Sequence, residues 1–66
     1  MIVGIVKEYN GKFGYIQTNS DMVDFNKKDI SNNEELKVGD KVLFRLEQRY
    51  PNVLIAKNIC KIKLTN

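Results

Sequence analysis

Short segments that alternate apolar and polar residues, each ended by a turn signal, dominate this chain and indicate strands rather than helices. Residues 2–9 are rich in β-branched side chains, and Asn10-Gly11 follows directly. This pair is preferred in two-residue type I′ turns, because both central positions need a positive φ. Residues 13–18 then predict the second strand of an antiparallel hairpin. Gly4, inside the first strand, indicates a bulge or a close approach of another strand.

Three further strands are predicted over residues 22–25, 41–47 and 53–64, with turns at 19–21, 38–40 and 50–52. Residues 26–30 predict a turn or a single helical turn, and residues 31–37 predict a polar loop. The strand over 41–47 alternates cleanly, so we expect three of its side chains to face a core: Val42, Phe44 and Leu46. In the last strand, Cys60 is expected to be a buried apolar residue.

Five short strands with regularly spaced turns predict a small barrel formed by one domain over residues 1–66. We expect an all-β, five-stranded antiparallel Greek-key barrel of the OB-fold type, in which the second and third strands present a nucleic-acid-binding face. An SH3-like barrel has a similar number of strands, so the pattern alone leaves both folds open. A chain of 66 residues buries only about 60% of its unfolded surface, so no deep substrate pocket is expected.

The net charge of +3 is unevenly distributed along the chain. Residues 37–66 hold seven basic and two acidic side chains, whereas residues 1–36 hold four basic and six acidic ones. A basic half attracts phosphates, although a solvated surface explains the same composition. The N-terminus lacks the features of a signal peptide, and no apolar run is long enough to cross a membrane, so we expect a cytoplasmic protein. Lys61 and Lys63 guard the last strand, which favours a monomer.

The chain contains no histidine and a single cysteine, Cys60. An intramolecular disulfide is therefore impossible, and no zinc site, other metal site or cofactor is predicted. Cys60 has no base to activate it, and Asp21 and Asp24 are three residues apart on a strand, which places them on opposite faces. We predict no catalytic residues and no small-molecule substrate.

Several short motifs follow one another along the chain in a recognisable order. Residues 4–10 read Gly-Ile-Val-Lys-Glu-Tyr-Asn, residues 12–16 read Lys-Phe-Gly-Tyr-Ile, and residues 21–25 read Asp-Met-Val-Asp-Phe. They resemble the opening strand and the two ribonucleoprotein motifs of bacterial cold-shock domains: Gly-x-Val-Lys-Trp-Phe-Asn, Lys-Gly-Phe-Gly-Phe-Ile and roughly Val-Phe-Val-His-Phe. Residues 39–44 and 56–59 resemble the later Gly-x-x-Val-x-Phe and Ala-x-Asn-Val of that family. The ribosome-associated S1-like domains imply almost the same biochemistry but fit residues 13–16 less well.

The resemblance implies an exposed aromatic platform on which bases of single-stranded RNA or DNA stack, and an RNA-chaperone activity without a cofactor. Phe13 and Tyr15 share one face of their strand, because they are two residues apart. Phe25 on the next strand is expected to extend the platform. The alternative for all three aromatic residues is a place in the core. The predicted nucleic-acid-binding residues are Lys7, Tyr9, Asn10, Lys12, Phe13, Tyr15, Phe25, Lys27 and Lys28.

Three positions on the expected binding face depart from the family pattern. Glu8 replaces the family tryptophan, Met22 replaces the first aromatic residue of the second motif, and Asp24 replaces its histidine. Each lost stacking position removes about 1–3 kcal/mol of binding free energy. We therefore expect weaker or altered binding, with a footprint shifted toward Lys27, Lys28, Arg45 and Lys57. The alternative is a protein-interaction barrel that has lost nucleic-acid binding, with Met22 in an adaptable apolar patch.

Overall fold

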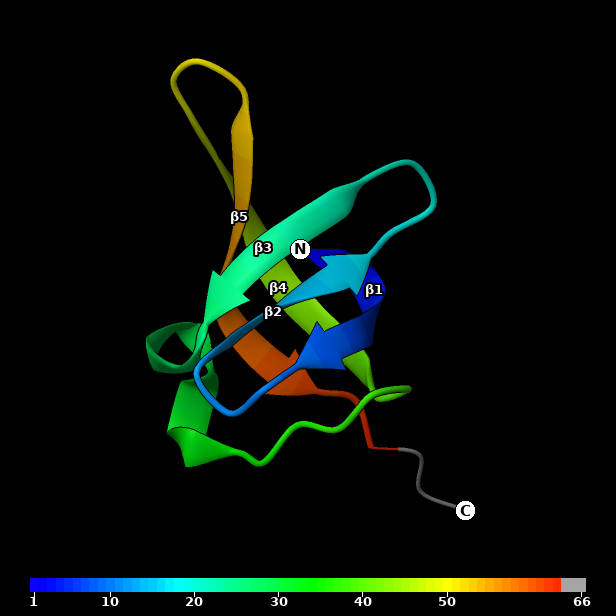
Figure 1. Cartoon of the computed structure of the whole chain (residues 1–66). Helices are drawn as coiled ribbons and strands as arrows, with labels where there is room; N and C mark the ends of the chain where they lie inside the picture. Colours follow the sequence, from blue (N-terminus) through cyan, green and yellow to red (C-terminus); the bar gives the residue numbers. More distant parts are fainter. Residues whose placement is uncertain (64–66) are drawn as a thin grey trace.

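The computed structural model describes residues 1–63 and shows a closed five-stranded β-barrel (Figure 1). The strands are β1 (Ile2–Tyr9), β2 (Phe13–Gln17), β3 (Met22–Asn26), β4 (Lys41–Arg49) and β5 (Val53–Lys61). Two 3-10 turns follow β3, namely η1 (Lys27–Asp29) and η2 (Ser31–Asn33). The strand order is β1-β2-β3-β5-β4, and only β3 and β5 run parallel. The all-β barrel prediction is confirmed, and the arrangement is consistent with the OB type.

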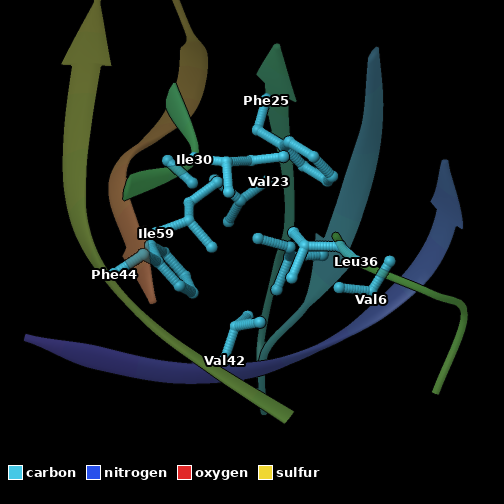
Figure 2. Packing of buried hydrophobic residues seen from close by; sticks show 10 residues of the cluster. Val6, Val23, Phe25, Ile30, Leu36, Val42, Phe44 and Ile59 are labelled. Carbon is cyan, nitrogen blue, oxygen red and sulfur yellow. The ribbon is translucent and has the colours of Figure 1, made fainter. Parts of the chain in front are cut away.

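Ten buried apolar side chains fill the barrel (Figure 2). Val42 and Phe44 are fully buried, as the alternation of β4 predicts. Leu36 is also buried, with only 4% of its surface exposed, although it belongs to the segment predicted as a polar loop. A lone apolar residue among polar ones has no periodicity, so the sequence pattern does not reveal that Leu36 packs into the core.

A bulge in β5 changes which of its side chains face the core. Leu43 pairs with Cys60 and Arg45 pairs with Lys57, so two residues of β5 oppose one residue of β4. The backbone of Asn58 at this point has a φ of 53°. The extra residue reverses the alternation, so that Ile59 is fully buried and Cys60 is only half-buried. The prediction of a buried Cys60 is therefore wrong.

Beyond this bulge, β4 and β5 continue as a two-stranded hairpin that projects from the barrel (Figure 1). Leu46 follows the same alternation as Val42 and Phe44, but it is 38% exposed. The prediction that Leu46 is a core residue is wrong, because the strand leaves the barrel there. The predicted turn at residues 50–52 forms the tip of this hairpin. The last predicted residue of β5, Leu64, lies outside the described residues.

The β1–β2 hairpin brings two aromatic rings together across a glycine. Gly14 pairs with Tyr9 on one side and with Phe25 on the other. Because Gly14 has no side chain, the two rings meet with their centroids 5.2 Å apart. A β-carbon on Gly14 would lie 2.8 Å from the Tyr9 Cα and would overlap the Glu8 carbonyl oxygen. The strands can approach this closely only with glycine at position 14.

The turn that joins β1 to β2 differs from the predicted type I′ turn. Asn10 N–H donates to the Phe13 carbonyl at 3.1 Å, so the two central residues are Gly11 and Lys12. Only Gly11 has a positive φ, of 93°, which matches the φ signs of a type II′ turn. The Asn10 side chain causes this difference: its Oδ1 accepts from the backbone N–H groups of Lys12 and Phe13, both at 2.9 Å.

The connection between β3 and β4 is fastened to β5 by two acidic side chains. Asp29 is 6% exposed, and its carboxylate accepts from Asn26 N–H and from the Lys57 ammonium group, both at 2.9 Å. Glu34 Oε1 accepts from Lys61 N–H at 2.8 Å. These contacts hold residues 27–34 against the barrel. The Asp29 carboxylate is buried, so it needs its hydrogen bonds to Asn26 and Lys57 to offset its lost hydration.

Asp40 organises the turn before β4. The Lys37 backbone N–H donates to Asp40 Oδ2 at 2.8 Å, and the Lys61 ammonium group lies 3.3 Å from the same oxygen. The hydrogen bond from Lys37 is the main cause that lowers the pKa of Asp40, and Lys61 adds to it, against partial desolvation. The ionised carboxylate therefore stabilises the folded state.

Candidate nucleic-acid interface

The outer face of β2 presents the two aromatic residues that the sequence singled out. Phe13 is 60% exposed and Tyr15 is partly exposed. Gly14 and Ile16, between and after them, belong to the inner face, and Ile16 is fully buried. The alternation of β2 thus keeps Phe13 and Tyr15 outside the barrel, where their rings are open to a ligand.

Phe25 does not extend this platform. Its side chain is 2% exposed and belongs to the core (Figure 2), so it offers no face to a base. The physical reason is the pairing of Phe25 with Gly14, because residues directly opposite on neighbouring strands share a face. The expectation that Phe25 extends the exposed platform is therefore wrong and the alternative of a core position applies, although Phe25 also lines the notch described below.

Tyr9 also points away from the predicted interface. The pairing of β1 with β2 shifts register between Val6 and Glu8, so Lys7 forms a bulge. This extra residue turns Glu8 to the outer face, opposite Tyr15, and Tyr9 to the inner face, opposite Gly14. Tyr9 is half-buried and packs against the core, so its predicted contact with nucleic acid on the β2 face is not supported.

Three of the predicted lysines belong to the segments that adjoin the Phe13 end of β2. Lys12 precedes Phe13, and its carbonyl accepts from Lys27 N–H at 2.8 Å, which joins the β1–β2 turn to η1. Lys12, Lys27 and Lys28 are exposed, and none forms an ion pair within residues 1–63. The backbone contacts therefore bring the segments that carry these three lysines close to Phe13, and the lysine side chains are exposed.

The Tyr15 end of the platform is acidic. Tyr15 pairs with Glu8 on β1 and with Asp24 on β3, so one carboxylate stands on each side of it. Both acidic side chains are exposed. A polyanion is repelled from this end and attracted to the Phe13 end. The sequence identified both carboxylates, but only the pairing register shows that they flank the same residue.

The remaining predicted polar residues have other surroundings. Lys7 is exposed at the β1 bulge, away from the Phe13 lysines. The Oδ1 atom of Asn10 is engaged by its own turn, which leaves its Nδ2 group for a ligand. Arg45 is exposed, whereas Lys57 is half-buried and paired with Asp29. The Lys57 ammonium group already pairs with Asp29, so of the residues toward which the footprint was expected to shift, Lys27, Lys28 and Arg45 are the exposed ones.

A shallow notch of about 410 Å³ opens beside Phe13, between β2 and β3 and the first residues of β5 in the projecting hairpin. Val53, which is 41% exposed, and Ile55 from β5 form its apolar side. Asp24 and Asn26 from β3 form its polar side. The notch escaped the sequence analysis, because β3 and β5 are far apart in the chain and no local pattern announces their contact.

The described residues bring together no group of three or more side chains that could hold a metal ion. No helix within residues 1–63 has the length and apolar character needed to span a membrane. In comparisons with models of protein families and with curated protein sequences, the chain matches none.

Proposed function

We propose that this protein binds single-stranded RNA or DNA in the manner of a cold-shock domain, as a cytoplasmic monomer that performs no catalysis. The observation that supports this function best is the ring of Phe13, 60% exposed at the end of β2 that adjoins the segments carrying the exposed Lys12, Lys27 and Lys28. An aromatic ring exposed to water is solvated unfavourably and adds little to the stability of the fold. Its place beside three unpaired ammonium groups suits a ligand with both π-faces and phosphates.

The footprint is centred on Phe13 rather than on the middle of β2. Stacking of one base on Phe13 contributes about 1–3 kcal/mol, and the lysines neutralise the phosphates on either side. The carboxylates of Glu8 and Asp24 disfavour phosphates near Tyr15. Binding is therefore weaker than a fully aromatic platform would give. Preference for the open strand shifts RNA from paired to unpaired forms without ATP, which accounts for a chaperone activity.

A salt titration of binding to fluorescent oligo-dT and oligo-U tests this function. Three lysine–phosphate contacts give a slope of about −2 in log K against log salt, since each contact with a single strand contributes about −0.7. Affinity then falls about 20-fold between roughly 50 and 200 mM salt. Absence of binding at low salt would refute the proposal.

Phe13→Ala locates the interface. Loss of the stacked base weakens binding by about 1–3 kcal/mol, which is about 5- to 150-fold. Tyr50→Ala is the matched control, because it removes an aromatic ring that is 97% exposed at the tip of the hairpin. Tyr50→Ala leaves binding unchanged. Equal losses in the two variants would contradict the placement of the interface on β2.

A protein-interaction barrel is the second candidate, and the exposed apolar side chains beside the platform favour it. Met22 is 48% exposed and Val53 is 41% exposed, next to the acidic Tyr15 end. Met in such a position adapts to different apolar partners. Phosphate binding weakens steeply with salt, whereas an apolar contact does not. A partner retained at high salt, together with no oligonucleotide binding at low salt, would favour this second function.

A further inference from the structure

The notch beside Phe13 has a geometry that a flat stacking platform lacks. Within the named strands β3 and β5 pair only at Asp24 and Ile55, so backbone pairing between these two strands does not continue on either side of that position. The resulting space of about 410 Å³ falls within the usual range of small-ligand sites, about 300–1,000 Å³. A base stacked on Phe13 therefore has a place for its edge.

The chemistry of the notch is asymmetric. The exposed ring of Phe13 and the side chains of Val53 and Ile55 provide apolar surface. Asp24 is exposed, and its side chain makes no hydrogen bond or ion pair with residues 1–63. An ionised carboxylate only accepts hydrogen bonds, and its two oxygens suit two parallel donors. The notch thus offers apolar contact to a ring and an acceptor pair to its edge.

We propose that this notch selects guanine, with the Asp24 carboxylate accepting hydrogen bonds from the ring N1–H and the exocyclic amino group of the base. This inference rests on the proposed function and adds a base preference to it. Guanine is the only standard base with two adjacent donors on its pairing edge. The guanine ring also stacks on the Phe13 ring, so one bound base makes both the hydrogen bonds along its edge and the stacking contact on its face.

The other bases fit the acceptor pair less well. Cytosine and adenine each place one amino group beside a ring nitrogen that is itself an acceptor, and this nitrogen repels the second carboxylate oxygen. Uracil and thymine have one N–H between two carbonyl oxygens, which repel Asp24 from both sides. The expected order of affinity is guanine first, cytosine and adenine next, and uracil or thymine last.

The test uses uridine heptamers with one variable central nucleotide and the unaltered protein. We expect the affinity for the heptamer with guanine to be at least about fivefold higher than the affinity for the all-uridine heptamer. This is the lower end of the discrimination that a bidentate base contact gives. Inosine lacks the exocyclic amino group and loses most of this preference. In contrast, 7-deazaguanine keeps the pairing edge and retains the preference.

Two variants with the same change of charge separate base selection from phosphate repulsion. Asp24→Asn and Glu8→Gln each remove one negative charge beside Tyr15, on opposite sides of it. Both variants bind the all-uridine heptamer more tightly, because one repulsive charge is gone. Only Asp24→Asn reduces the preference for guanine below about twofold, since Glu8 does not border the notch.

The outcomes distinguish this inference from the proposed function. Equal binding of all heptamers, or a guanine preference that survives in Asp24→Asn, overturns the base selection and leaves nucleic-acid binding intact. Absence of binding to any heptamer at low salt overturns both. A preference that disappears with inosine and with Asp24→Asn, but persists with 7-deazaguanine and with Glu8→Gln, establishes the contact.

Discussion

Replacement of Gly14 by alanine is expected to destabilise the barrel through a steric conflict with the neighbouring strand. The added β-carbon would lie 2.8 Å from Tyr9 Cα and 2.9 Å from Glu8 carbonyl carbon. Both atoms belong to the backbone, so no side-chain rotation relieves the contact. Overpacking of this kind costs about 1–3 kcal/mol, toward the upper end when backbone must move. Alanine regains about 0.5–1 kcal/mol relative to glycine in a strand.

The net expectation for Gly14→Ala is a loss of about 2 kcal/mol from a domain whose total stability is about 3–10 kcal/mol. The melting temperature then falls by roughly 8–16 °C, because each kcal/mol shifts it by about 4–8 °C in a domain of this size. Thermal unfolding followed by circular dichroism measures the shift, and urea unfolding checks that the slope m is unchanged. A variant within about 0.5 kcal/mol of the original protein would refute this reasoning.

Gly11 provides the matched control, because its requirement for glycine has a different origin. It has a φ of 93°, and nothing lies within 4 Å of a β-carbon placed there. Substitution of Gly11 costs about 1–2 kcal/mol through the backbone alone, so Gly11→Ala and Gly11→Lys lose similar amounts. At Gly14 the cost grows with side-chain size, and Gly14→Val destabilises more than Gly14→Ala. Equal losses for the two Gly14 variants would contradict a steric origin.

Three further predictions concern stability. Phe25→Ala loses about 3–5 kcal/mol because it empties the core, whereas Phe13→Ala loses less than about 1 kcal/mol; calorimetry compares them, and equal losses would contradict their assigned faces. Asp29→Ala loses about 3 kcal/mol in urea unfolding, because it leaves the Lys57 ammonium group half-buried and unpaired, and a change below about 0.5 kcal/mol would show that the pair is dispensable. The pKa of Asp40 lies below the ordinary 3.8, so its contribution to the free energy of unfolding is complete above that pH and is lost as the pH falls through the lowered folded-state pKa. Asp40→Asn removes this part of the loss of stability in acid. Identical profiles of stability against pH for the variant and the original protein would refute this prediction.

The sequence predicted the architecture well because most of its signals are local. The period-two alternation places Val42 and Phe44 in the core and Phe13 and Tyr15 outside it. Turn residues separate the strands near the expected positions. Each of these inferences needs only neighbouring residues, whose faces the pleat of a strand determines.

The mistaken predictions for Tyr9 and Cys60 arise where a β-bulge, with one extra residue in the strand, interrupts the alternation of inward and outward side chains. The bulge at Lys7 reverses Tyr9, and the bulge before Cys60 reverses that residue. Nothing in the composition of either segment announces the change, because a bulge depends on the register of the partner strand. Phe25 was misplaced for a related reason: its face follows from the pairing with Gly14, which is a contact between strands rather than a pattern within one.

The candidate site was only partly predictable. Its residues were recognisable one by one, and the structure adds their grouping: lysines at the Phe13 end, carboxylates at the Tyr15 end, and the notch toward β5. The ion pair that occupies Lys57 is equally invisible in the sequence, since Asp29 lies within the β3–β4 connection, 28 residues before Lys57. These residues come together only when strands that are distant in the sequence pair to close the barrel, so the sequence pattern does not reveal their grouping.

That closure has a consequence for the order of folding events. β1, β2 and β3 pair with their sequence neighbours, and so do β4 and β5, whereas two pairings join distant parts of the chain: β1 with β4, as in Ile2 with Phe44, and β3 with β5, at Asp24 and Ile55. Contacts between distant residues form late, because the intervening chain loses more entropy before they contribute. We expect both of these pairings to form late, and the β3–β5 seam, which has one paired position against four between β1 and β4, to exchange its amide hydrogens first. A base held in the notch would contact both β3 and β5, so a bound ligand would slow the local separation of these two strands.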